Sequence, residues 1–162
     1  YTLNSGVSLA SMTTKETFTY KLTGDNGTSD TATLTIDMAP KFVSSEHNDT
    51  FTGRAYGDTL IYQVLNSTAG NATAGNSAGD HWTNFSLAQG DKIDISDLLV
   101  GWNGQSATLG NYLHVTNSNG NTVISVDRDG AANIYTNTTL VTLDNVQTTY
   151  EELVNQQHII TS

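Results

Sequence analysis

The stretch "SSEHNDTFTGRAYGDTLIY", Ser44 to Tyr62, contains one short pattern twice. Asp49-Thr50-Phe51 recurs nine residues later as Asp58-Thr59-Leu60. In each copy an aspartate precedes a residue pair that suits a short strand, because Thr and large apolar residues are common in strands. A nine-residue period predicts a winding of short strands in which the apolar residue of each strand points inward.

The calcium-binding β-roll repeat has the form G-G-x-G-x-D-x-(apolar)-x. Gly53, Asp58 and Leu60 fit this form, whereas Arg54 and Tyr56 stand where the repeat has glycine. The first copy keeps only its aspartate and its apolar residue. Calcium accepts carboxylate and carbonyl oxygens in loose geometry, so the aspartates are candidate ligands. The alternative is that the pattern recurs by chance in a Thr-rich chain.

Composition favours strands and turns and argues against several kinds of partner. The 162 residues are 36% hydrophobic and 14% charged, and the formal net charge is −10. The six Lys and Arg residues are scattered, so we expect neither nucleic acid nor an anionic membrane surface as a partner. No apolar run is long enough to span a bilayer, and the absence of cysteine excludes disulfides and thiolate sites.

Two segments before Pro40 show the period-two alternation of half-buried strands. Apolar Phe18, Tyr20 and Leu22 alternate with Thr and Lys, and "ATLTID" (32–37) continues the pattern after a turn. Two or three strands do not make an independent domain. Residues 1–39 are therefore interpreted as the last strands of a preceding β-sandwich repeat, with Pro40 as the boundary to a domain at 40–162.

The second domain contains a small-residue loop at 66–80 and then a series of short strands. The expected strands are "HWTNFSL" (81–87), "DKIDIS" (91–96), "YLHVTN" (112–117), "TVISVD" (122–127), "NIYTN" (133–137) and "LVTLDNV" (140–146). Such a density of short strands predicts all-β architecture. Helical turns are expected at 96–101, with Ser96 as cap, and at 148–158, where Thr148 with Glu151 or Thr149 with Glu152 forms a capping box.

Asp127 and Asp129 in "SVDRDGAANIY" (125–135) are separated by one residue. If the preceding strand continues, the two carboxylates share a face and repel each other. A divalent cation would remove this repulsion, with backbone carbonyls or Asn133 completing its ligands. The other reading is a solvated turn closed by Gly130, which needs no ion.

The order of these motifs resembles the C-terminal region of RTX-like bacterial adhesins that leave the cell by type I secretion, the biofilm-associated family. The resemblance covers residues 44–162 and lies in "GDTLIYQVLN" (57–66), "DHWTNF" (80–85), "DKIDISDLL" (91–99) and "DRDG" (127–130), followed by the terminal helix. Asn84 departs from the family pattern, which has an acid there. Residues 1–39 resemble the last strands of the immunoglobulin-like repeats that precede this region in such adhesins.

The resemblance implies an all-β fold, a β-sandwich or degenerate calcium β-roll with one short C-terminal helix. It implies a non-catalytic, extracellular module at the bacterial cell surface, involved in cell adhesion and biofilm formation. Its partners would be the type I secretion apparatus and neighbouring repeats of the same chain, and its cofactor would be Ca²⁺. The candidate calcium ligands are Asp49, Asp58, Asp80, Asp91, Asp127 and Asp129.

Two other classes of function stay open at this point. The first is a carbohydrate-binding β-sandwich in which Trp102, in "GWNGQ" (101–105), and polar loops hold surface glycans. The second is an enzyme of the glycosidase or lyase type, with Asp91, Asp94 and Asp97 as its acids. No nucleophile motif or H-E-x-x-H spacing supports an enzyme, and capping is the expected work of Asp94 and Asp97.

Overall fold

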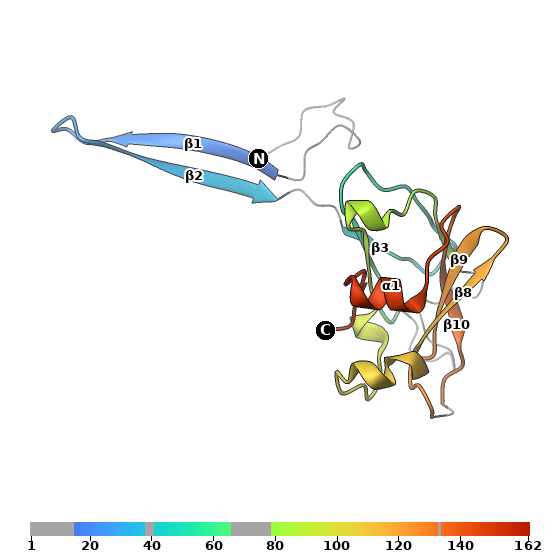
Figure 1. The fold of residues 1–162 in the computed structure, drawn as a ribbon. Helices are drawn as coiled ribbons and strands as arrows, with labels where there is room; N and C mark the ends of the chain where they lie inside the picture. Colours follow the sequence, from blue (N-terminus) through green and yellow to red (C-terminus); the bar gives the residue numbers. More distant parts are fainter. Residues whose placement is uncertain (1–14, 38–40, 66–78, 133) are drawn as a thin grey trace.

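The computed structural model describes residues 15–37, 41–65, 79–132 and 134–162. They form a two-stranded hairpin and a separate body of two sheets (Figure 1). The boundary at Pro40 and nearly all of the loop expected at 66–80 lie outside the described residues. The β-rich class expected from the sequence is confirmed.

The hairpin joins β1 (Lys15–Thr23) to β2 (Ser29–Asp37) in antiparallel register, with Phe18 opposite Leu34 and Tyr20 opposite Ala32. The alternation therefore places the apolar side chains on one face, as expected. The predicted half-burial is not observed, because Phe18 is 44% and Leu22 69% exposed. Tyr20 and Leu34 on the same face are each 52% exposed.

In the body the chain winds back and forth between two sheets, and this arrangement is called the winding below. One sheet has the order β11-β7-β5-β3 with all strands parallel, and the other has the order β4-β6-β10-β9-β8. In the second sheet β4, β6 and β10 are parallel, and β9 and β8 are added antiparallel. The first sheet comprises β3 (Lys41–Val43), β5 (Thr59–Ile61), β7 (Lys92–Asp94) and β11 (Ile159–Ile160). The second comprises β4 (Thr50–Phe51), β6 (Asp80–Trp82), β8 (Leu113–Ser118), β9 (Asn121–Val126) and β10 (Thr138–Leu143).

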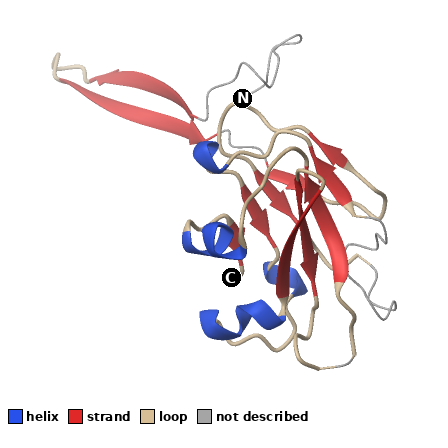
Figure 2. Cartoon of the chain, turned by 45° about the vertical axis from the view of Figure 1, so that its right-hand side comes forward, coloured by secondary structure: helices blue, strands red, loops and turns tan. Residues whose placement is uncertain are grey.

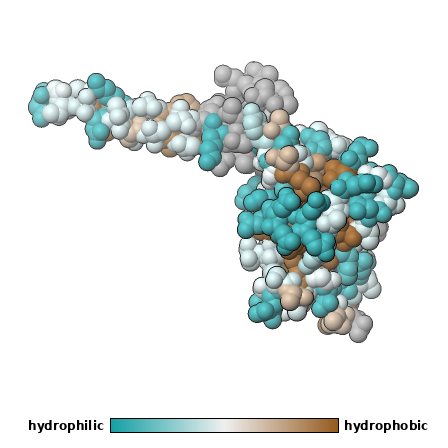
Figure 3. Space-filling view, viewed as in Figure 1, coloured by the Kyte–Doolittle hydropathy of each residue, from teal (hydrophilic) through white to brown (hydrophobic). Residues whose placement is uncertain are grey.

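The core lies inside this winding, and the two copies of the opening pattern both contribute to it. Phe51 of the first copy pairs in register with Trp82, and Leu60 of the second pairs with Ile93. All four are buried, and the ring of Trp82 packs edge-on against that of Phe85 at 5.1 Å. The nine-residue step thus carries the chain from one sheet to the other while each apolar residue stays inside. Hydrophilic side chains cover much of the outer face shown in Figure 3.

The helices are short and gather on one side of the strands (Figure 2). They are η2 (Leu87–Gln89), η3 (Ser96–Leu98), η4 (Ser106–Asn111) and α1 (Tyr150–Asn155). Of the two expected capping boxes, the Thr149–Glu152 pair supplies the N-cap bond, since the Thr149 hydroxyl accepts the Glu152 N–H at 3.2 Å, while the Glu152 carboxylate accepts the Thr148 hydroxyl at 2.8 Å. Ser96 was wrongly expected to cap a helix. Instead Asp94 accepts hydrogen bonds from the Ser96 N–H and hydroxyl.

One expected strand is absent from the described residues. Residues 134–137 of "NIYTN" are not in a strand. The N–H groups of Ile134 and Tyr135 donate to the Asp129 carboxylate, at 3.0 and 3.3 Å. The Asp129 side chain therefore binds the backbone N–H groups that a strand would use for pairing, and residues 134–137 lie in a loop.

Candidate functional site

The turns of the winding hold four of the predicted ligands, Asp49, Asp58, Asp80 and Asp91, here called the turn aspartates. Each begins or directly precedes a strand, in the order β4, β5, β6 and β7. The strand registers place Asp49 beside Asp80 in one sheet and Asp58 beside Asp91 in the other. The structure therefore brings them together as two separate pairs, one in each sheet.

Each pair is joined by the same hydrogen bond. The Asp49 N–H donates to Oδ1 of Asp80 at 2.9 Å, and the Asp58 N–H donates to Oδ1 of Asp91 at 2.8 Å. The second oxygens also have donors. Oδ2 of Asp91 accepts the Ser86 N–H, and Oδ2 of Asp80 accepts the hydroxyls of Ser44 and Tyr62.

Asp58 has a cation as its partner. Its Oδ1 lies 3.2 Å from Nη2 of Arg54, its Oδ2 accepts the Arg54 N–H, and both side chains are buried. A Cβ at Gly53 would lie 2.5 Å from Oδ2 of Asp58, so a larger residue there would displace this carboxylate. Asp49 closes an equivalent turn by accepting from the N–H and hydroxyl of Ser45.

Burial sets the ionisation behaviour of this region. Burial raises the pKa of the Asp91 carboxyl, and the N–H donors of Asp58 and Ser86 oppose that rise only in part. Burial also raises the pKa of Tyr62 well above its ordinary value, and the adjacent Asp80 charge adds to this effect. Tyr62 therefore stays a neutral donor to Asp80.

Whether the turn aspartates can bind calcium depends on the donors that their oxygens already contact. Calcium needs free carboxylate or carbonyl oxygens, typically six to eight around one point. Both oxygens of Asp58, Asp80 and Asp91, and Oδ2 of Asp49, already face N–H, O–H or guanidinium donors. Among the described residues no three His, Asp or Glu side chains gather at one point. Calcium at the turn aspartates thus stays a prediction, and it would require them to exchange these donors for the ion.

Asn84, the departure from the family pattern, has a definite function in the winding. Its Oδ1 accepts the Gly53 N–H at 2.6 Å, and its Nδ2 donates to the Gly53 carbonyl at 2.8 Å. This two-bond clamp joins the turn after β4 to the turn after β6. A carboxylate could accept but not donate, so the amide is chemically required here.

Asp127 and Asp129 lie in a turn after β9, closed by Gly130 at φ 63°. The Asp129 N–H donates to Oδ1 of Asp127 at 3.3 Å. Desolvation and the hydrogen bond with the Asp129 side chain raise the pKa of Asp127. For Asp129, desolvation is outweighed by the donors Ile134, Asp127 and Tyr135, and the pKa is lowered. The chain does turn here, but Asp129 is buried rather than solvated.

Sequence reasoning did not assign a role to Arg128, which lies between these two acids. Its side chain is buried, and its Nε donates to the Leu98 carbonyl at 3.1 Å. Its guanidinium carbon also lies 4.5 Å from the centre of the Tyr135 ring. Arg128 thus fastens the 127–135 loop to the end of η3. The alternation of charges in "DRDG" gives no signal for this contact.

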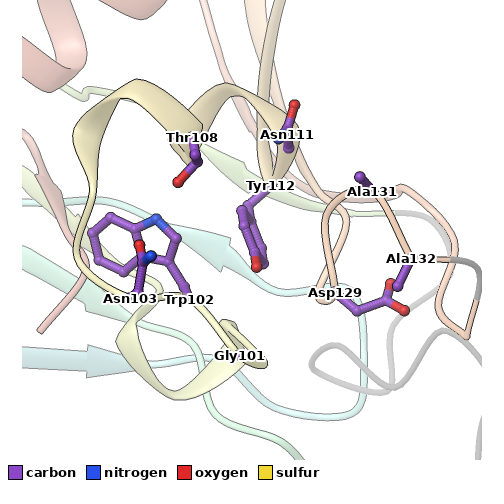
Figure 4. Close-up of a pocket in the computed structure, with 9 residues that line it drawn as sticks. All are labelled: Gly101, Trp102, Asn103, Thr108, Asn111, Tyr112, Asp129, Ala131 and Ala132. Atoms are coloured by element: carbon purple, nitrogen blue, oxygen red, sulfur yellow. The ribbon is translucent and has the colours of Figure 1, made fainter.

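Trp102 and Asp129, predicted for different ligands, line the same pocket (Figure 4). The pocket has a volume of about 240 Å³, and it lies between the Gly101–Asn103 loop, η4 with Tyr112, and the Asp129–Ala132 loop. Trp82, by contrast, is fully buried in the core. The acids considered for hydrolysis do not enter this pocket: Asp94 binds Ser96, and Asp97 is exposed.

No helix in the described part of the chain is both long and apolar enough to cross a membrane. No protein-family model, curated protein or solved structure matches this chain.

Proposed function

We propose that this chain is a non-catalytic, extracellular module at the C-terminal end of a large bacterial surface adhesin. It would terminate the preceding repeats, carry the type I secretion signal and bind calcium weakly. The observation that carries the proposal is the two-sheet winding, in which strands headed by an aspartate alternate between the sheets. The finer fold that we propose is a degenerate β-roll whose sheets face each other as in a sandwich.

The row of turn aspartates stops within each sheet, and this supports the proposal that the module terminates the repeats. In the next strand of each sheet the register places Val141 beside Asp80 and Gln157 beside Asp91. The pattern of turn aspartates therefore stops at β10 and β11. The second sheet then continues with antiparallel β9 and β8 instead of another parallel strand. Preceding repeats would lie on the opposite side, at β3 and β4.

The hairpin supports the division into 1–39 and 40–162. An isolated two-stranded hairpin is marginally stable in water. Tyr20 and Leu34, both 52% exposed, belong to an apolar face that the remainder of an immunoglobulin-like repeat would cover. We therefore propose that β1 and β2 are the last strands of such a repeat.

We place calcium at Asp127 and Asp129 in preference to the turn aspartates. Burial raises the pKa of Asp127 and the adjacent Asp129 carboxylate adds to that rise, and a cation between the two carboxylates would offset their repulsion. With few acidic ligands the affinity would belong to the weak extracellular class, with a Kd of about 10⁻⁴–10⁻³ M. Calcium would then be bound outside the cell and absent inside it.

The export assignment is tested by fusing the full chain to the C-terminus of an unfolded passenger in a cell with a matching type I exporter. Deletion of Thr148–Ser162 is expected to abolish secretion. The control is Arg54→Met, which disturbs the fold but leaves that segment intact and is expected to be secreted. If the deletion is secreted as well as the intact chain, the segment has only a structural role and the export proposal is wrong.

A further inference from the structure

The pocket beside Trp102 has walls that are already fixed. Tyr112 is held by its hydroxyl, which donates to the Val100 carbonyl at 3.3 Å. Its ring lies so close to Gly130 that a Cβ there would be 2.9 Å from the ring edge. Figure 4 shows Trp102 next to Tyr112, with the Asp129–Ala132 loop beyond. Two aromatic faces therefore border the space without any need for rearrangement.

The pocket also holds polar groups with unused hydrogen-bonding capacity. In the described part of the chain, Nε1 of Trp102 is shielded from solvent and has no hydrogen-bond partner. Figure 4 shows this nitrogen on the indole edge nearer to Tyr112. The Asp129 carboxylate accepts the N–H groups of Ile134 and Tyr135 and is also hydrogen-bonded to the Asp127 side chain, which leaves about one of its four lone-pair sites for another donor. Asn103 uses its Oδ1 to accept from Gln105, so its amide N–H groups are available.

Charge and size restrict what can bind here. The chain carries a net charge of −10, and Asp129 is at the pocket, so phosphate and carboxylate ligands are disfavoured. The volume of about 240 Å³ is below the ~300–1,000 Å³ usual for drug-sized ligands. A neutral, compact molecule with one apolar face and a rim of hydroxyls fits both limits.

We propose that this pocket binds one neutral pyranose ring of a glycan. The C–H face of the sugar would stack on the aromatic walls of Trp102 and Tyr112, and its hydroxyls would donate to Asp129 and accept from Asn103. This inference deepens the proposed adhesion function by naming the class of partner. In this proposal Trp102 is one wall of a formed pocket and not an isolated aromatic residue on the surface.

The test uses the two tryptophans of the full chain as site and reference. Neutral methyl pyranosides are titrated in the presence of a chelator, while the indole N–H signals of Trp102 and Trp82 are followed by NMR. Trp102→Phe assigns the signals. The Trp102 signal is expected to shift saturably with one of the sugars, and the core Trp82 signal is expected to stay in place.

Two variants support the reading of the titration. Asp129→Asn is expected to weaken binding about tenfold in this titration, and Trp102→Ala, which removes the reporting indole, is expected to weaken it about tenfold by calorimetry. Tyr56→Ala, which removes an exposed aromatic outside the pocket, should leave binding unchanged. No saturable shift of Trp102 with any neutral pyranoside, or equal shifts of both tryptophans, would overturn the proposal. The chelator keeps this outcome independent of calcium, and the absence of a passenger keeps it independent of export.

Discussion

Nη2 of Arg54 lies 3.2 Å from Oδ1 of Asp58, and the two side chains are 4% and 0% exposed. The chain has only six Lys and Arg residues, and it buries this one inside the winding beside a turn aspartate. In a calcium-binding roll this turn would hold an ion. Here the guanidinium supplies a positive charge at the carboxylate, so the turn can close without a metal.

The first prediction concerns this pair. Arg54→Met is expected to lower the free energy of unfolding by about 3–5 kcal/mol, because it leaves a buried carboxylate without its cation. Arg54→Met combined with Asp58→Asn should recover part of that loss. The measurement is a double-mutant cycle by urea unfolding, and Lys41→Met, which removes an exposed cation, is the control at less than about 0.5 kcal/mol. Additive losses from the two buried substitutions would show that the pair is not coupled.

The second prediction concerns the Asn84 clamp. Asn84→Asp keeps the acceptor for the Gly53 N–H but replaces the donor to the Gly53 carbonyl with an oxygen. We expect a loss of about 0.5–1.5 kcal/mol in unfolding free energy, since the clamp is exposed. The matched control is Asn121→Asp, where the side chain only accepts, from the Asn145 N–H, and an aspartate keeps that bond. Equal effects of the two substitutions would mean that added charge, not the lost donor, is responsible.

Local patterns predicted the elements whose partners are close in sequence. The alternation around Phe18 and Leu34 gave both hairpin strands, and the Thr149–Glu152 spacing gave the start of α1. The strand expected at 133–137 was wrong over its described residues, because Asp129, several residues away, takes the N–H groups of Ile134 and Tyr135. Periodicity records which side chains are apolar, and it does not record a carboxylate that competes for backbone donors.

The candidate site was only partly predictable, for a related reason. The recurring Asp-x-apolar pattern identified Asp49 and Asp58, but their partners Asp80 and Asp91 are more than thirty residues away. Register between distant strands decides those pairs, and no local signal contains it. Trp102 and Asp129 likewise line one pocket although they are far apart in sequence, and the bond from Arg128 to the Leu98 carbonyl is one of the contacts that join their segments.

The third prediction concerns pH. Burial raises the pKa of Asp91 above its ordinary value of 3.8 in the folded chain. The folded state therefore binds this proton more tightly than the unfolded state, so protonation favours folding. The resulting stability is present below the ordinary pKa and is lost as pH rises through the raised one. The unfolding free energy of the wild type minus that of Asp91→Asn should fall from about pH 3.5 upward and then level off.

Urea unfolding of both proteins across that range measures the difference, and it cancels the titration of the other acids. If the difference instead rises with pH, the N–H donors from Asp58 and Ser86 outweigh burial, and the direction assigned to Asp91 is wrong.

The fourth prediction concerns calcium at the turn after β9. A ligand that binds only the folded chain stabilises it by RT ln(1 + [L]/Kd). With a Kd of about 1 mM, about 10 mM calcium would add about 1.4 kcal/mol and raise the melting temperature by roughly 3–5 °C. Asp127→Asn should abolish this shift while keeping the hydrogen bond from the Asp129 N–H, because the amide oxygen can still accept it. Asp97→Asn removes the same charge from an exposed acid outside this turn, and it should leave the shift intact. Equal melting temperatures in calcium and in chelator would show that no ion binds at this turn. A shift that survives in Asp127→Asn would show that calcium binds elsewhere, and the turn aspartates would be the next residues to substitute.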